Sequence, residues 1–503
     1  MNLAERLRAV VRPAGGSPPH RAGVRGGDPG PDQPSPRLRR SAEADAKAEG
    51  PHGAPEAVAD VLGGAWRESR GRSASADRPA SAGLSGRAAT RPRYLVIDRQ
   101  YPAGHVLGRV AVADCLPAAD GLWPRLDLLM CGGTGSGALH GRLLFLDLET
   151  TGLAGGAGTY AFLVGCGWFE GAAFRVRQFF LSSYAAERGL LDDVAETMGA
   201  AGALVTYNGK TFDLPLIDTR FLFHRMQVSF NSLPHLDMLH PARRLWSPSR
   251  LRRYGEPRRS LGVGGRSQSP VNSPVEAGER RATCGLTLVE QAVLGHVRKG
   301  DVPGFEIPSR YFHYVRTGDA RPLDVVLEHN RLDVLALAML TARAARLLEE
   351  GAAGARTARE ALGLGRLYER GGMPAEARAC FVRAAELDAD PPTRAEALRA
   401  YGVLCGRERR YADAADTWRR MLVLRGCPPR LAQEATDALA VHHEHRLRDL
   451  HAARQFAMQA LQFTISPARV EAVRHRLTRI DRKLAYPEQS RRGGPPLQPA
   501  PLF

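Results

Sequence analysis

The chain has 503 residues, and its 70 Lys and Arg against 53 Asp and Glu give a formal net charge of +17. This length exceeds what one hydrophobic core supports, which predicts two or three domains and some unstructured segments. The basic excess is compatible with a polyanionic partner such as nucleic acid, but genome composition explains the Arg-rich sequence equally well.

Cysteine usage and hydropathy argue against secreted and membrane proteins. The seven cysteines are scattered and none are spaced Cys-x-x-Cys, unlike a disulfide framework or a structural zinc site. The N-terminal stretch MNLAERLRAVVRPAGG lacks the apolar core of a signal peptide, and no run reaches the roughly 20 apolar residues that span a bilayer. We therefore expect a soluble, cytoplasmic protein without membrane contact.

The chain begins with a segment, 1–90, that is rich in Gly, Pro, Ser, Ala and Arg. Its few large apolar residues cannot offset the entropy of ordering, so it is predicted to be a disordered tail. Hydrophobic alternation starts at RYLVIDRQYPAGHVLG, which makes 91–140 a strand-containing N-terminal extension. A second disordered tail is expected at 483–503.

The segment 141–350 has the pattern of a folded domain. Three closely spaced strand signals indicate a meander, and alternating helices and strands follow them. In chain order, the predicted elements are strands at Leu143–Glu149, Tyr160–Phe169 and Phe174–Leu181, a helix at Glu187–Met198, a strand ending in LVTYN, a helix at Phe212–Met226, a strand at HLDML and further helices to about Glu350. This order predicts an α/β fold, a mixed sheet with helices on both faces.

The stretch 247–282 interrupts this domain with the Pro, Gly and Ser content of a loop and a cluster of Arg. Structureless loops of this length are uncommon inside compact domains and are usually functional or disordered. We interpret the stretch as a solvated basic loop insertion, and the alternative is a basic arm for a phosphate backbone.

Residues 355–482 carry a helical repeat. Aligning LGRLYERGGMPAEARACFVRAAEL with YGVLCGRERRYADAADTWRRMLVL places small residues and an aromatic residue in the same register. The superposed pairs are Gly365 with Gly402, Ala377 with Ala414 and Phe381 with Trp418, and a looser third copy keeps Ala453 and Ala457. This pattern is typical of tetratricopeptide repeats and predicts a short superhelix with a concave face for a protein partner. The alternative is an all-helical lid on the preceding domain.

Two carboxylates end the apolar run LLFLDLETTGL. Asp147 and Glu149 are two residues apart, so in a strand their side chains project to the same face. An unpaired carboxylate in a buried place costs roughly several kcal/mol, which requires a basic side chain or a metal ion beside it. Hard cations such as Mg²⁺ prefer carboxylates, so this pair is a candidate metal site.

Two later stretches contribute further candidate ligands. YNGKTFDLPLI places Asp213 just inside a helix that follows a strand, where ligands are commonly received. GKT is not a phosphate-binding loop, because Leu204 stands where that motif requires Gly. His329 and Asp333 lie one helical turn apart and share a face, where they can supply a base and a metal ligand. For Asp237, capping of the next helix is the favoured interpretation.

Together, the stretches FLDLETTGL, YNGKTFDLP and HNRLDV resemble the three exonuclease motifs of the DEDD superfamily, which has a ribonuclease H-like fold. The chain is most similar to YprB-type ribonuclease H-like domains, which are often followed by tetratricopeptide repeats. The resemblance covers about residues 141–345 and continues into the repeats. It implies a ribonuclease H-like mixed sheet flanked by helices, followed by an all-α tetratricopeptide-like helical-hairpin domain.

The resemblance also implies roles for individual residues. The family's four acidic positions, which hold two Mg²⁺ or Mn²⁺ ions, are matched by Asp147, Glu149, Asp213 and Asp333, and its general base by His329. The candidate substrate-binding residues are Thr150, Asn208, Lys210 and Asn330. In the family, a His base stands five residues before the last aspartate and a Tyr base four. This chain has His at the four-residue spacing, so the motif alone does not assign the base.

The function that the resemblance implies is a metal-dependent 3′–5′ exonuclease on single-stranded DNA or RNA ends, working by a two-metal mechanism. Two alternatives stay open, because a fold does not choose a reaction. One is a structure-specific endonuclease. The other is a tetratricopeptide scaffold whose nuclease-like domain only binds nucleic acid.

Overall fold

A computed structural model of the protein describes residues 55–69, 92–117, 123, 125–130, 141–152, 158–228, 233–246, 284–463 and 466–485. The predictions for the basic insertion at 247–282 and for most of the tails at 1–90 and 483–503 lie outside the described residues.

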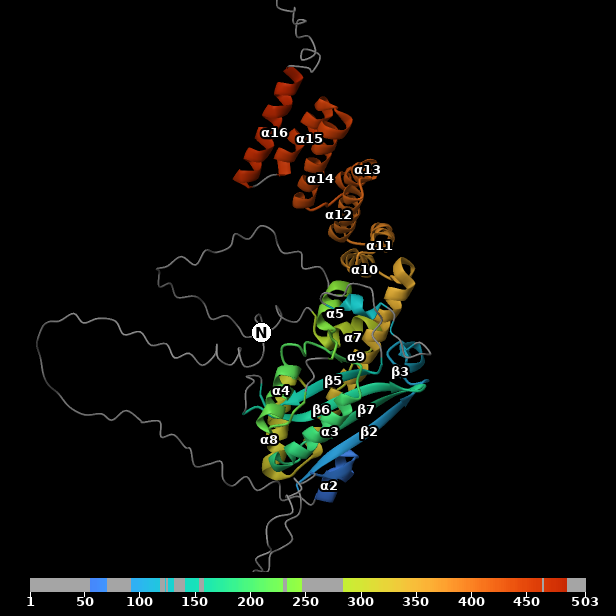
Figure 1. Cartoon of the computed structure of the whole chain (residues 1–503), viewed down its shortest axis with the longest axis vertical. Helices are drawn as coiled ribbons and strands as arrows, with labels where there is room; N and C mark the ends of the chain where they lie inside the picture. Colours follow the sequence, from blue (N-terminus) through green and yellow to red (C-terminus); the bar gives the residue numbers. More distant parts are fainter. Residues whose placement is uncertain are drawn as a thin grey trace, which may run out of the picture. The chain divides into compact units, whose positions relative to one another are not determined.

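A mixed sheet of seven strands forms the centre of the described α/β region (Figure 1). Its strands run in the order β1-β2-β7-β6-β5-β8-β9. Their bounds are Ala65–Glu68 for β1, Arg93–Pro102 for β2, Leu143–Thr150 for β5, Ala161–Glu170 for β6, Ala173–Phe180 for β7, Ala203–Thr206 for β8 and His235–Asp237 for β9. β5, β6 and β7 are the antiparallel meander that the sequence predicts, and β8 and β9 run parallel to β5. A small separate hairpin pairs β3 (Val106–Leu107) with β4 (Val110–Ala111).

The sheet begins earlier in the chain than the sequence analysis predicts. The sequence predicts a disordered tail at 1–90, but helix α2 (Pro55–Leu62) and strand β1 lie within that segment. β1 is an edge strand of the central sheet, and β2 lies between β1 and β7. The reason is local, since Val58 and Leu62 of α2 are buried in the core although the surrounding composition is polar. An average over a long segment hides such a short apolar patch.

Two hydrophobic cores explain why β5 is an unbroken apolar run. Phe145 contributes to the core that contains the second half of α9 (Asp324–Glu350), whereas Leu146 contributes to the core that contains residues of α3 and α4. A strand buried on both faces needs apolar residues at every position. Asp147 and Glu149 alternate with Leu146 and therefore project to the same side as Phe145, toward α9.

The helices of the α/β region pack onto this sheet. Their bounds are Glu187–Gly199 for α3, Asp213–Phe223 for α4, Leu239–Leu245 for α5, Leu286–Leu294 for α7, Ile307–Thr317 for α8 and Asp324–Glu350 for α9. Short 3₁₀ helices lie at Val112–Cys115, Leu126–Leu129, Tyr184–Ala186, Gly304–Glu306, Arg321–Leu323 and Gly351–Gly354. α9 contacts β5, β6 and β7, and α3 contacts β2 and β7. This arrangement confirms the predicted mixed sheet with flanking helices.

α9 approaches the sheet closely because β6 carries glycines beneath it. A Cβ atom at Gly165 would lie 2.3 Å from Asn330 Oδ1, and a Cβ at Gly167 would lie 2.5 Å from Val334 Cγ1. These distances are too short for real contacts, so any side chain at either position would push α9 or its side chains away from the sheet.

A buried ion pair ties α4 to α3. Arg220 of α4 is completely buried, and its Nε donates to Glu187 Oε1 of α3 at 2.6 Å. His224 Nε2 lies 2.7 Å from the other oxygen of the same carboxylate. The Arg220 guanidinium also lies 4.3 Å from the ring centroid of Tyr160. Because Asp213 is the first residue of α4, these contacts also help to hold its position.

The C-terminal region is all-helical, as predicted. Its helices are α10 (Ala358–Arg370), α11 (Pro374–Glu386), α12 (Pro391–Arg407), α13 (Tyr411–Leu422), α14 (Pro429–His442), α15 (Leu450–Phe463) and α16 (Pro467–Ala485), with a π-helical turn at His443–Leu447. Successive helices pack in pairs along the chain. Gly365 faces Phe381, and Gly402 faces Trp418, so the two aligned segments share the same helix crossing. The tetratricopeptide assignment and the concave partner face stay predictions.

Two further observations concern the described residues. Six of the seven cysteines are described, and all of them carry free thiols. None of the helices there is both long and apolar enough to cross a membrane.

We expect Arg220→Met to lower the free energy of unfolding by about 3 to 5 kcal/mol, because it leaves the Glu187 carboxylate buried without its cation. Urea denaturation measures this loss. The double variant Arg220→Met/Glu187→Leu removes both charges and is expected to recover part of it. A double variant that is less stable than the single one would contradict this account of the ion pair.

Candidate active site

The first part of the site is the end of β5. Asp147 and Glu149 are half-buried there, and the strand pairing shifts between Glu149 and Thr150. This irregularity marks the place where β5 leaves the regular ladder, which directs the chain away from the two carboxylates. The Thr150 hydroxyl donates to the carbonyl of Gly152 at 3.0 Å.

The second part is Asp213, the first residue of α4, which follows β8 after a tight turn. Asp237, at the end of β9, accepts hydrogen bonds from the backbone of this turn. Its Oδ1 accepts from Asn208 N at 2.7 Å, and its Oδ2 accepts from Lys210 N at 3.2 Å. Asn208 has a positive φ of 68°, a conformation that asparagine tolerates better than most residues.

Asp237 also accepts from the backbone N of Leu239, the first residue of α5, at 3.1 Å. The N-cap residue of α5 is Met238 and not Asp237, so this one bond is all that the predicted capping amounts to. Asp237 is buried, and its bonds to the Asn208–Lys210 turn help to place Asp213. A sequence gives no signal for this second role, because 24 positions separate Asp237 from Asp213.

The third part lies on α9. His329 Nδ1 is 2.6 Å from Asp301 Oδ1, and His329 Nε2 is 3.6 Å from Asp333 Oδ2. The imidazole therefore stands between two carboxylates. Sequence reasoning did not identify Asp301, which lies in the loop before α8, far from any of the three motifs.

A basic side chain, Arg298, lies beside the carboxylates. Its Nη2 is 2.6 Å from Asp333 Oδ1 and 2.7 Å from Glu290 Oε2, and its side chain is only 5% exposed. The charges of Glu290 and Asp333 raise the pKa of the Arg298 guanidinium although burial opposes this. The positive charge of Arg298 thus offsets part of the negative charge at the end of β5. The sequence contains many Arg residues, and nothing distinguishes this one.

Burial raises the pKa of Asp147 and of Glu149 well above the usual range for carboxyl groups, and the neighbouring charges of Asp333 and Asp213 raise both further. Burial also raises the pKa of Asp213 to about 7, with smaller contributions from Asp237 and Asp333. Arg298 acts in the opposite direction on the pKa of Glu149. The carboxylates therefore influence one another, although they come from three separate elements.

The predicted substrate-binding residues occupy different environments. Lys210 is exposed on the turn before α4, and Asn208 and Thr150 are half-buried. Asn330 is different, because it is completely buried and its Nδ2 donates to Asp147 Oδ2 at 2.8 Å. The structure therefore corrects its predicted role, since a side chain without exposed surface does not contact substrate.

The donor chemistry of the site suits a hard divalent cation. Neighbouring carboxylates raise the pKa of Asp147 and of Glu149, and a bound cation would relieve this repulsion. In the described part of the chain, no group of three or more His, Cys, Asp or Glu side chains is already arranged to hold a metal ion. Asp333 contacts Arg298, and Asp147 contacts Asn330. The donors of the site are nevertheless carboxylate oxygens, the type of ligand that Mg²⁺ and Mn²⁺ prefer.

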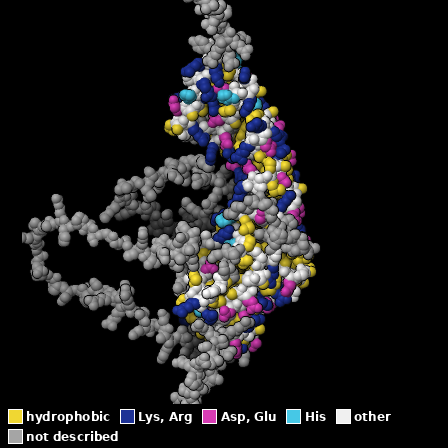
Figure 2. Space-filling view, in the orientation of Figure 1, with side chains coloured by type: hydrophobic (Ala, Val, Ile, Leu, Met, Phe, Trp, Pro, Cys, Tyr) yellow, Lys and Arg dark blue, Asp and Glu magenta, His cyan; other side chains and the backbone are white. Residues whose placement is uncertain are grey.

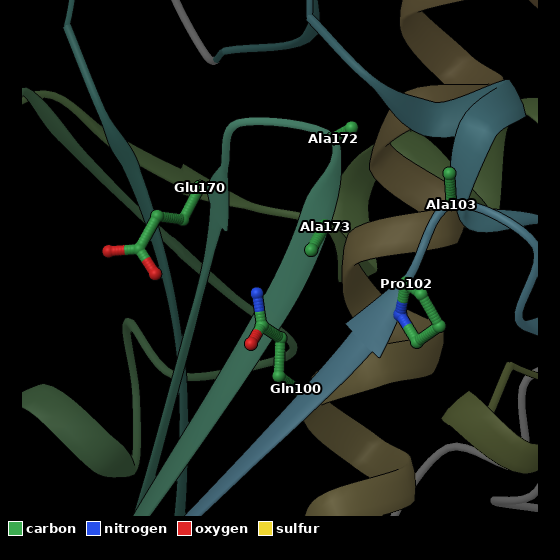
Figure 3. A pocket seen from close by; sticks show the side chains of 6 residues that line it. All are labelled: Gln100, Pro102, Ala103, Glu170, Ala172 and Ala173. Carbon is green, nitrogen blue, oxygen red and sulfur yellow. The ribbon is translucent and has the colours of Figure 1, made fainter.

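A shallow hollow of about 470 Å³ lies at the opposite end of β6, beside the turn to β7 (Figure 3). Figure 3 shows Gln100 and Glu170 as its two polar lining side chains, and Glu170 accepts from Arg175 Nε at 2.8 Å. The hollow has no cluster of reactive groups, so we do not assign chemistry to it.

The fold and the carboxylates define the class of protein. Residues 144–255 and 271–345 match the family model of the RNase_H superfamily. The α/β region of this chain is therefore similar to the ribonuclease H superfamily, a similarity that supports nuclease activity.

The resemblance also extends to a particular protein. Over 392 residues the chain is 27% identical to the "Uncharacterized protein YprB" of Bacillus subtilis (strain 168), and the match spans 77% of this chain and 86% of that protein. The similarity is therefore longer than the α/β region alone. It confirms the resemblance to the YprB-type family.

We expect Asp213→Asn to stabilise the metal-free protein near pH 7.5 and to have no such effect at pH 4. The pKa of Asp213 is raised in the folded state to about 7, so its contribution to stability is present below about pH 4 and is lost as the pH rises toward 7. Asn does not ionise and avoids this loss. The gain at pH 7.5 should be about 2 kcal/mol, because each pKa unit is worth about 1.4 kcal/mol and partial exposure reduces the effect.

Urea denaturation in EDTA at both pH values measures the effect. Asp192→Asn, on α3 and outside the carboxylate cluster, is the matched control. Equal effects of Asp213→Asn at pH 4 and pH 7.5 would refute the electrostatic explanation.

Proposed function

We propose that this chain is a metal-dependent 3′–5′ exonuclease that acts on single-stranded DNA or RNA ends. The observation that carries the proposal is the concentration of acidic side chains at the end of β5, where the charges of Asp213 and Asp333 act on Asp147 and Glu149. Such a concentration of acidic side chains is unfavourable for stability, so its presence is best explained by function. The match of residues 144–255 and 271–345 to the ribonuclease H superfamily model supports the same conclusion.

The four carboxylates are the proposed ligands of two Mg²⁺ or Mn²⁺ ions. When bound, such ions activate a water molecule and stabilise the leaving oxygen of a phosphodiester. The half-buried position of Asp147 and Glu149 limits the access of bulk water, which strengthens their interaction with a cation. Arg298 would offset part of the negative charge of the site through its contact with Asp333.

His329 is the proposed general base, and Asp301 is proposed to orient it. An imidazole that donates its Nδ1 proton to Asp301 keeps Nε2 unprotonated and able to accept a proton from water. Nε2 also faces Asp333, so the base would lie beside a proposed metal ligand. This geometry supports His329 although the four-residue spacing departs from the family's His-type motif.

Substrate contacts are proposed for Thr150, which follows Glu149 on β5, and for Asn208 and Lys210 on the turn before Asp213. The basic surface of the C-terminal helices offers a further region for a polyanion. Figure 2 shows dark blue Lys and Arg side chains over these helices with acidic side chains among them. Arg476 and Arg479 of α16, for example, pair with Asp437 and Glu444. A protein partner on these helices and a cytoplasmic location remain predictions.

Incubation with 5′-labelled single-stranded DNA and RNA tests the activity. With Mn²⁺ or Mg²⁺ we expect a ladder of shortened products, and EDTA or the variant Asp147→Ala/Glu149→Ala should abolish it because the metal ligands are lost. Asp413→Ala/Asp416→Ala, on the exposed face of α13, removes the same two charges and should cleave normally. Discrete internal cuts would instead support a structure-specific endonuclease. Nucleic-acid binding without any cleavage would favour the scaffold alternative.

We expect His329→Gln to lower the single-turnover cleavage rate about 100-fold, because general-base catalysis contributes about this much. Asp301→Asn should cause a smaller loss in the same direction, since it only orients the imidazole. His313→Gln on α8 is the matched control. Wild-type rates in His329→Gln would assign the base to another group.

A further inference from the structure

Three residues on adjacent strands form a row across the sheet beneath α9. Asp147 of β5 pairs with Gly165 of β6, and Gly165 pairs with Gln178 of β7. Residues directly opposite in antiparallel strands project to the same face. Asp147 and Gln178 therefore point to the same side of the sheet, with only a hydrogen atom of Gly165 between them.

Asn330 of α9 fills the space above Gly165. Its Nδ2 donates to both the side-chain Oδ2 of Asp147 at 2.8 Å and the backbone O of Asp147 at 3.2 Å. Its Oδ1 accepts from Gln178 Nε2 at 2.8 Å. Asn330 thus bridges the two ends of the row.

Gln178 determines which way the Asn330 amide points. Its Nε2 has two hydrogens, and they are used by Leu327 O at 2.8 Å and by Asn330 Oδ1. A reversed Asn330 amide would place two donors together at Gln178 and two acceptors together at Asp147. Gln178 and Asn330 are 1% and 0% exposed, so water cannot compensate for such an error.

We propose that Gln178 and Asn330 are positioning residues that hold one oxygen of Asp147 in place and leave the other available to a divalent cation. This inference rests on the proposed metal-dependent function. It adds two positioning residues to the site, and one of them, Gln178, lies on β7, which carries none of the three motifs. Groups that orient metal ligands in this way typically change metal affinity about 10- to 100-fold when they are lost. Gly165 is also required for this hydrogen-bonded arrangement, because a side chain there would displace Asn330.

The two glycines of β6 provide a matched test in the full-length protein. Gly165→Ala would force Asn330 aside, whereas Gly167→Ala would press on the apolar side chains of Val334 and Phe174. Both substitutions strain the packing of α9, but only the first disturbs the bonds to Asp147. Mn²⁺ affinity, measured by electron paramagnetic resonance, and thermal unfolding in EDTA separate the two effects.

We expect Gly165→Ala to weaken Mn²⁺ binding at least about 10-fold and Gly167→Ala to leave it within about threefold of wild type, with similar losses of thermal stability. Equal affinities in the two glycine variants would overturn the inference. Absence of Mn²⁺ binding in the wild type would instead refute the proposed metal-dependent function, so the two failures are distinguishable.

Substitutions of Gln178 test whether it fixes the orientation of the Asn330 amide. Gln178→Met keeps the volume and removes the donor, so the Asn330 amide is no longer fixed. Gln178→Glu offers acceptors and favours the reversed Asn330 amide, so it should weaken Mn²⁺ binding more than Gln178→Met does. Wild-type affinity in both variants would show that Gln178 has only a structural role.

Discussion

The structure depends on the electrostatic problem of holding four carboxylates together at the end of a buried strand. Burial and mutual repulsion both favour the protonated forms, which is why the pKa values of Asp147, Glu149 and Asp213 are raised. Repelling groups keep a defined geometry only on rigid supports. β5 provides such a support, because it lies inside the sheet and contributes to hydrophobic cores on both faces.

Each part of the acidic cluster has a separate partner that orients it. Asn330 bonds to Asp147, Arg298 contacts Asp333, and Asp237 holds the turn that leads to Asp213. The partners are an amide, a guanidinium group and a carboxylate bonded to backbone N–H groups. They come from different elements, so the site is assembled only when α4, α9 and the loop before α8 have all packed onto the sheet.

α9 connects the site with the rest of the protein. Its first half carries His329, Asn330 and Asp333, and its second half belongs to a hydrophobic core shared with the C-terminal helices. The hydroxyl of Tyr368 in α10 donates to the carbonyl of Leu348 in α9 at 2.6 Å. The C-terminal helices therefore begin on a helix that also carries site residues, and Gly165 and Gly167 allow this helix to lie close to β6.

The sequence by itself determined the order of most strands and helices along the chain, the α/β class and the positions of the acidic motifs. It could do so because hydrophobic alternation and helical periodicity are local properties. It missed α2 and β1, since their short apolar patch is diluted by the polar residues around it. Only the tertiary structure decided the partners, because Gln178, Arg298 and Asp301 act through contacts with residues far away in the sequence. Hydrogen bonds and ion pairs of this kind depend on how strands and helices pack together, and no local pattern encodes them. For the same reason Asn330 was predicted to bind substrate, whereas its burial between the sheet and α9 makes it a support for Asp147.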